Sequence, residues 1–315
     1  MTVATNRVPR FGAVLAAALL LLSGCAANRY RAPITGFQTA AGTAIASARQ
    51  YYLESNKAER DHYIDDRAAT KDAIDSKQLE TIRRSFSAED IGARMEALGA
   101  LGDYTALLLK LATSDAPAEA AKQVGAVEAS VAKFADRAAK LCDDAGCVGE
   151  NKEFKAAASN VAAVVSPILK GLLAQKIQRG LDKSVQTAEK PIADLIDAIR
   201  RDMANLQERR RQAISDLWSL AVRRYNDEQK KTSPDFDRLA ALAERVKALS
   251  DKQDQLVSAN PDRALAAMNR AHQALVQFSR QDKSPSNLSD LADAVQAFAN
   301  EAALAGRALR ALTGI

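Results

Sequence analysis

The chain is poor in aromatic residues and has only two histidines and three cysteines among its 315 residues. No stretch alternates apolar and polar side chains between hairpin turns, which excludes a sheet-based fold. Apolar residues instead recur at steps of three and four, most clearly at Ile192, Leu195, Ile196, Ile199, Met203, Leu206, Ile214, Leu217 and Ala221. That spacing places them along one face of a helix. The sequence therefore predicts an all-α protein.

Recognisable catalytic motifs are also missing. The sequence contains no G-x-S-x-G elbow, no glycine-rich phosphate loop and no H-E-x-x-H pair. Residues 130–133 match the S-x-x-K pattern of penicillin-recognising enzymes, but the S-D-N and K-T-G elements of that family are absent. We therefore expect a protein that is not an enzyme and that carries no cofactor.

One histidine has a spacing typical of metal ligands. Glu59 and His62 form an E-x-x-H pair, which ferritin-like proteins use in duplicate to bind iron. The second histidine, His272, has Asn269 rather than a carboxylate three residues before it. Half of the ligand set is therefore missing, and we predict no metal site.

The amino terminus combines two arginines, Arg7 and Arg10, with a charge-free run over 11–22. This pattern is typical of a secretory signal peptide, predicted here over residues 1–24. The run ends in Leu22-Ser23-Gly24-Cys25, which resembles the lipobox of bacterial lipoproteins. The resemblance implies cleavage before Cys25, acylation of Cys25 by palmitate-like chains, and a membrane anchor facing the periplasm. Ala26, the residue after the cysteine, favours an anchor in the outer membrane. The alternative is an anchor in the periplasmic face of the inner membrane.

The other two cysteines, Cys142 and Cys147, are separated by the four residues of an Asp-Asp-Ala-Gly turn. In an oxidising compartment such a pair normally closes as a disulfide. We therefore predict a Cys142–Cys147 disulfide between two antiparallel helices.

Proline and capping residues divide the rest of the chain. They predict eight helices in an elongated antiparallel bundle, near 35–78, 87–113, 117–141, 151–188, 190–231, 234–258, 261–281 and 285–312. Residues 25–34 would be a lipidated tether. Because the residue before a proline avoids helical geometry, Pro191 suggests a boundary between an N-terminal lobe over 35–189 and a C-terminal lobe over 190–315. One kinked helix through Pro191 is the alternative.

Two stretches have an unusual distribution of charge. The segment 156–169 has no charge, and its length favours a buried core helix over a membrane insertion. The segment 189–231 is rich in arginine but interleaved with acids such as Asp202, which is typical of a solvated face. Removal of the signal lowers the formal charge from +5 to +3, so we predict no nucleic-acid partner.

The first long helix is polar in its middle and carries a candidate partner surface of Tyr52, Glu59, His62 and Tyr63. Steps of seven and eleven return close to the same helical angle, so Tyr52, Glu59 and Tyr63 share a face. The alternative is that the two tyrosines fill the core.

We consider three candidate functions, beginning with the one that we expect most. The first is a lipid-anchored envelope protein that acts by protein–protein contact, as a scaffold, adaptor or inhibitor. The second is a periplasmic binder that holds a small molecule or envelope polymer between its helices. The third is an enzyme whose residues carry no recognisable motif. A pocket with convergent polar groups would favour the second, and a flat apolar patch the first.

Overall fold

The structure is a computed structural model that describes residues 25–83, 88–113, 117–141, 150–173, 177–259 and 261–313. These ranges form nine helices and no strand, so the all-α prediction is confirmed. The helices are α2 (Cys25–Thr70), α3 (Ser76–Arg83), α4 (Ala88–Thr113), α5 (Pro117–Lys140), α6 (Glu150–Leu173), α7 (Ile177–Gln229), α8 (Phe236–Ser258), α9 (Pro261–Arg280) and α10 (Pro285–Thr313).

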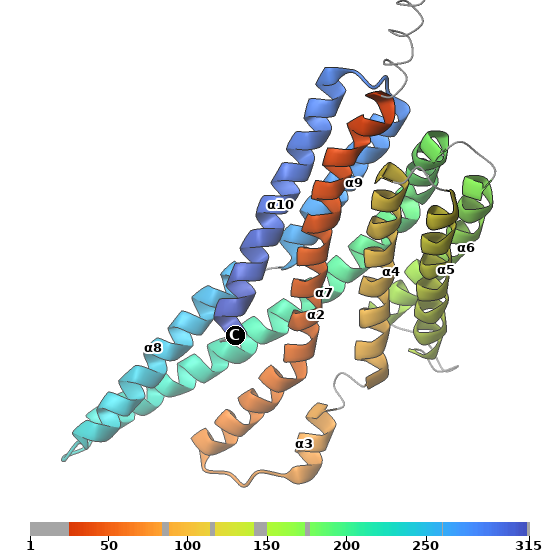
Figure 1. The fold of residues 1–315 in the computed structure, drawn as a ribbon. Coiled ribbons are helices and arrows are strands. Elements are labelled where there is room, and N and C mark those ends of the chain that lie inside the picture. Colours follow the sequence, from red (N-terminus) through yellow and green to blue (C-terminus); the bar gives the residue numbers. More distant parts are fainter. Residues whose placement is uncertain are drawn as a thin grey trace, which may run out of the picture.

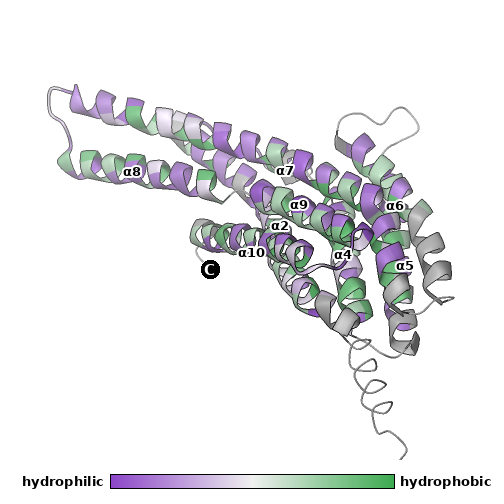
Figure 2. Cartoon of the chain, turned by 90° about the horizontal axis from the view of Figure 1, so that it is seen from above, coloured by the Kyte–Doolittle hydropathy of each residue, from purple (hydrophilic) through white to green (hydrophobic). Residues whose placement is uncertain are grey.

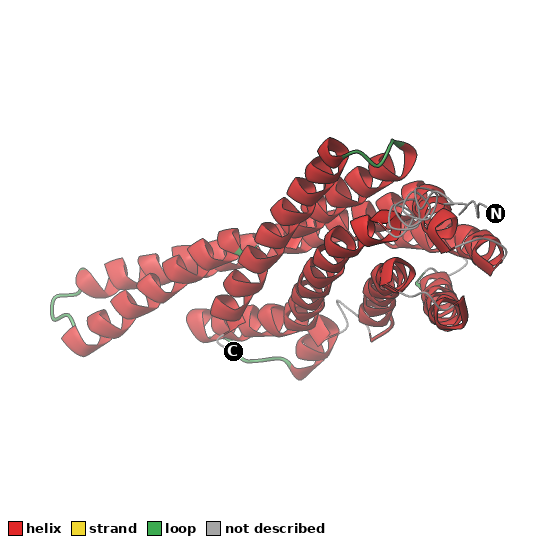
Figure 3. Ribbon diagram, turned by 45° about the horizontal axis from the view of Figure 1, so that its top comes forward, coloured by secondary structure: helices red, strands yellow, loops and turns green. Residues whose placement is uncertain are grey.

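The body of the molecule is built on α2 and α7. Helix α2 packs between α10 and α4, and α7 runs diagonally across the bundle against α6, α9 and α4 (Figure 1). Helices that follow one another in sequence, such as α4–α5, α5–α6 and α9–α10, pack side by side as expected for short connections. The result is elongated, with one end formed by α7 and α8 alone (Figure 3).

The apolar stripe predicted between 192 and 221 lies in the core along its first half. Leu195, Ile196, Ile199 and Leu206 are fully buried, whereas Ile214 is only partly buried against the core. The stripe therefore leaves the body near Leu206, where α7 continues with α8 as its main neighbour.

The predicted boundary at Pro191 falls inside α7, which is one helix from Ile177 to Gln229. A proline inside a helix costs roughly 3 kcal/mol. The buried residues Leu181, Val185, Ala188, Ile192 and Leu195 continue at steps of four and three across the proline, so packing outweighs that cost. The buried core is one cluster on both sides of Pro191. The expected helix over 151–188 is instead divided between α6 and α7, which pack against each other.

The predicted tether over 25–34 is also helical. Helix α2 begins at Cys25, and Tyr30 and Ile34 are buried in the core. The Tyr30 ring meets the Phe278 ring edge-on at 5.0 Å, and its hydroxyl donates a hydrogen bond to Asp182. Helical spacing continues from Tyr30 through Ile34, Phe37 and Ala41, so the core includes part of the segment that was predicted to be a tether.

At its other end α2 stops at Thr70, eight residues earlier than expected, and α3 follows as a separate helix. Lys71 adopts a positive φ of 60°, and the Asp72 amide donates to the Arg67 carbonyl at 3.1 Å. This arrangement is typical of a helix end closed by a left-handed residue.

Helices α7 and α8 form a hairpin that projects from the body and carries many hydrophilic side chains (Figure 2). Beyond Leu206 the buried residues of α7 are Ala221 and Glu228, and those of α8 are Leu249 and Leu256. Within the described residues, no helix is both long and apolar enough to span a bilayer.

Candidate functional site

A cleft of about 420 Å³ lies where the hairpin leaves the body, between the second half of α2, the middle of α7 and the second half of α8. Its lining is Glu54, Lys57, Glu59, Asp61, His62, Asp65, Arg209, Arg210, Gln212, Ala213, Ile214, Asp216, Leu217, Leu249 and Lys252. The volume is within the usual range of small-ligand sites. An ion pair between Asp65 of α2 and Arg245 of α8 joins two of the walls.

Two of the four residues of the predicted partner surface line this cleft. Glu59 and His62 are both partly buried there, on the wall formed by α2. The Nδ1 atom of His62 is enclosed and has no hydrogen-bond partner in the described part of the chain. The polar middle of the first long helix therefore does contribute to a concave surface.

Tyr63 has a local structural role instead. Its hydroxyl oxygen accepts a hydrogen bond from the Asp75 amide at 3.0 Å, and Arg67 lies over its ring at 5.3 Å. These contacts hold the connection between α2 and α3.

Tyr52 was placed on the partner surface, and this prediction is wrong. Its side chain is fully buried. Arg94 lies over its ring at 5.8 Å, and burial, followed by the negative charge of Asp202, raises the Tyr52 pKa well above its usual range. Glu59 lines the cleft, whereas about two helical turns earlier the same face of α2 is covered by other helices at Tyr52, so a shared helical angle did not mean shared exposure.

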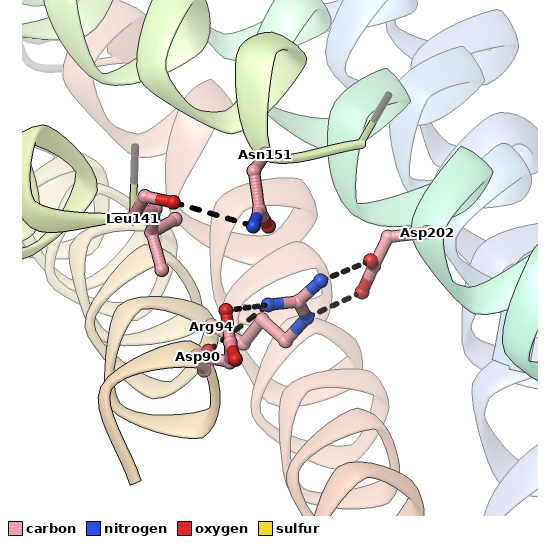
Figure 4. A network of polar contacts seen from close by, with 5 residues as sticks. All are labelled: Asp90, Arg94, Leu141, Asn151 and Asp202. Carbon is pink, nitrogen blue, oxygen red and sulfur yellow. Dashed lines mark hydrogen bonds and ion pairs between the residues drawn. The ribbon is translucent and has the colours of Figure 1, made fainter. Parts of the chain in front are cut away.

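The residues around Tyr52 include a buried ion pair that links α4 to α7 (Figure 4). Arg94 donates to the two carboxylate oxygens of Asp202, from Nε at 2.8 Å and from Nη2 at 2.5 Å. Its Nη1 also donates to the Asp90 carbonyl at 3.1 Å. Both side chains are less than 5% exposed. Neither side chain lines the cleft, so the pair links α4 to α7 and does not contribute to the lining.

Asp202 was expected on a solvated face, and the structure corrects this. It is seven residues after Leu195 and three after Ile199, so its helical angle coincides with the buried stripe. That coincidence is the signal in the sequence that could have identified it. Several of the neighbouring arginines do form surface ion pairs: Arg200 with Asp197 and Asp262, Arg201 with Glu153, and Arg211 with Glu208.

Arg210 of α7 is one of the cations that line the cleft. Its guanidinium lies over the Tyr51 ring at 4.7 Å, and burial raises the Tyr51 pKa while the charge of Arg210 opposes that rise. The Nε and Nη1 atoms of Arg210 are enclosed and have no acceptor in the described part of the chain. The guanidinium therefore lies against the Tyr51 ring with part of its hydrogen-bonding capacity unused.

Metal binding has no support from the arrangement of ligands. In the described ranges no group of three or more His, Cys, Asp or Glu side chains is arranged so that it could hold a metal ion. His272 is fully buried in the core, where its Nε2 lies 2.8 Å from the Tyr104 hydroxyl. The predicted signal peptide over 1–24 and the predicted Cys142–Cys147 disulfide fall outside the described residues.

Comparison with known proteins adds no relative. No protein-family model, no curated protein and no solved structure matches this chain.

Proposed function

We propose that this chain is a lipid-anchored cell-envelope protein that acts by contact with another envelope protein, as a scaffold, adaptor or inhibitor. The observation that supports the proposal is the α7–α8 hairpin, which leaves the body and ends at Phe236 with 81% of its surface exposed. The hairpin buries few residues, so its length contributes little to the core. A projecting element that carries an exposed aromatic ring at its tip is suited to contact a partner, because aromatic residues are enriched at protein interfaces.

The tip is held in a fixed shape. Glu228 is almost fully buried at the end of α7 and forms ion pairs with Lys231 at 2.7 Å and Arg238 at 3.1 Å. Asp235 caps α8 by accepting hydrogen bonds from the amides of Asp237 and Arg238. These contacts pre-organise the turn that presents Phe236, which lowers the entropic cost of binding a partner.

The proposed anchor and the tip lie at opposite ends of the molecule (Figures 1 and 2). Helix α2 has 46 residues, about 70 Å at 1.5 Å per residue. Because α2 begins at Cys25 and is buried from Tyr30, acyl chains on Cys25 would place the body directly on the membrane surface. The hairpin would then reach away from the membrane. In our proposal the body lies on the periplasmic leaflet of the outer membrane.

The anchor is tested by lipid labelling. We expect a clickable palmitate analogue to label the wild-type protein in growing bacteria, and expect the Cys25→Ser variant to lose the label because it has no thiol to acylate. The measurement is in-gel fluorescence normalised to protein amount. Equal labelling of both proteins would exclude lipidation at Cys25.

The contact function is tested at the hairpin tip. Phe236→Ser should reduce recovery of the cross-linked partner from native envelopes at least fivefold, because it removes the exposed ring. It should change the free energy of unfolding by only about 0.5 kcal/mol, as most surface substitutions do. Leu304→Ser is the matched control, since Leu304 is 51% exposed on α10. Equal recovery with both variants would contradict a role for the tip.

A second candidate function, binding of a ligand between helices, is supported by a different observation. The cleft brings polar side chains from α2, α7 and α8 toward one apolar floor. This arrangement is typical of sites that orient a small ligand.

A further inference from the structure

We propose that the cleft between α2, α7 and α8 binds a short zwitterionic peptide segment. The anionic group would lie toward α7 and α8, and the ammonium group toward α2. The inference rests on the proposed binding of a ligand between helices and is independent of the hairpin tip.

The walls of the cleft differ in charge. The α2 wall carries four carboxylates, from Glu54, Glu59, Asp61 and Asp65; Lys57 pairs with Glu54 and Arg245 of α8 pairs with Asp65, which leaves the Glu59 and Asp61 carboxylates as the uncompensated charges of this wall. The opposite side, from α7 and α8, carries three cations, Arg209, Arg210 and Lys252, against the single carboxylate of Asp216. A ligand with charge of one sign would be attracted by one wall and repelled by the other, so the cleft discriminates against it.

The floor between these walls is apolar. It is formed by Ala213, Ile214 and Leu217 of α7 together with Leu249 of α8. Leu249 is buried, whereas Ile214 and Leu217 are partly exposed to the cleft. A ligand therefore meets a surface that favours an apolar side chain between its charged ends, as in a tripeptide, whose extended length is about 10 Å.

Arg210 is placed to receive the anionic group. Its guanidinium lies over the Tyr51 ring at 4.7 Å, and its enclosed Nε and Nη1 atoms have no acceptor in the described ranges. An unsatisfied buried donor is destabilising, and more so when the group is charged. A small shift of the guanidinium toward a ligand carboxylate would satisfy these donors. Lys252, exposed on α8, adds a second cation on the same side.

The test uses the purified full-length protein and three peptides, each acetylated and amidated: Lys-Leu-Glu, Lys-Leu-Lys and Glu-Leu-Glu. Binding is measured by isothermal titration calorimetry, which needs no reporter group in the cleft. We expect Lys-Leu-Glu to bind with a Kd at least tenfold below the Kd of either other peptide. The absence of saturable binding of Lys-Leu-Glu up to 10 mM (~3 kcal/mol of binding free energy), or no preference for it, would overturn the proposal.

A charge reversal adds a second readout. Lys252→Glu should weaken binding of Lys-Leu-Glu at least tenfold and strengthen binding of Lys-Leu-Lys. Lys247→Glu is the matched control, because Lys247 is exposed on the same helix and does not line the cleft. If both variants have the same effect, the cleft does not select by charge. Such a failure would leave the result with Phe236→Ser unaffected, because that experiment reads recovery of a partner at the tip.

Discussion

Replacing Asp202 by asparagine is expected to lower the free energy of unfolding by about 3 kcal/mol, the lower end of the range for breaking a buried ion pair. The substitution keeps the shape of the side chain but removes its charge. The Arg94 guanidinium would then remain in the core with the Asp90 carboxylate 3.9 Å from Nη1 as partial compensation. Denaturant unfolding followed by circular dichroism measures the loss.

The double variant Arg94→Met with Asp202→Leu distinguishes the effect of the two charges from the effect of side-chain packing at these positions. Replacing both charges by apolar side chains leaves no buried charge without a partner, so we expect a loss of about 1 kcal/mol or a gain. If Asp202→Asn costs less than 1 kcal/mol, the pair does not hold α4 to α7 as the geometry indicates. If the double variant is as unstable as the single one, packing rather than charge is responsible.

Lowering the pH from 7 to 5 is expected to reduce the free energy of unfolding by about 2 kcal/mol through His272 alone. Complete burial lowers the pKa of His272 to about 4, against 6.5 for an ordinary histidine. Between these values the unfolded chain binds a proton that the folded protein does not bind. Stability is therefore complete above pH 6.5 and is lost as the pH falls toward 4.

His272→Gln provides the comparison. Glutamine does not titrate but can still accept a hydrogen bond from the Tyr104 hydroxyl, which lies 2.8 Å from Nε2 in the native protein. Between pH 7 and pH 5 the unfolding free energy of His272→Gln should change by about 2 kcal/mol less than the unfolding free energy of the wild type. Exposed carboxylates titrate mainly below pH 5 in both proteins. Parallel pH profiles would mean that the pKa of His272 is not lowered in the folded protein.

Local signals in the sequence predicted the C-terminal helices well. Helices α9 and α10 begin at Pro261 and Pro285 as expected, and Asp235 caps α8 within two residues of its predicted start. Proline and capping residues act through neighbouring backbone atoms, so they can be read without tertiary information.

Long-range packing decided the features that the sequence did not predict. Pro191 lies inside α7 and residues 25–34 lie inside α2 because both segments bury apolar side chains against helices distant in sequence. Arg94 and Asp202 are 108 residues apart, and no local pattern relates them.

The candidate site could be predicted only in part, again because long-range packing brings its residues together. Glu59 and His62 were expected on a functional surface and do line the cleft. Tyr52 shares their helix and was expected beside them, but the helices that cover it are specified elsewhere in the chain. The cations Arg209, Arg210 and Lys252 were not proposed as part of that surface, because only the fold brings α7 and α8 to α2.

The most direct test of the proposed contact function is site-specific photo-cross-linking in living cells. A benzoyl-phenylalanine residue at position 236 would sample whatever the hairpin tip touches, and the same residue at position 304 would sample the exposed face of α10. We predict one dominant adduct with an envelope protein from position 236 and none at comparable yield from position 304. No adduct at 236 from a normally abundant, lipidated protein, or the same adducts at both positions, would contradict the account.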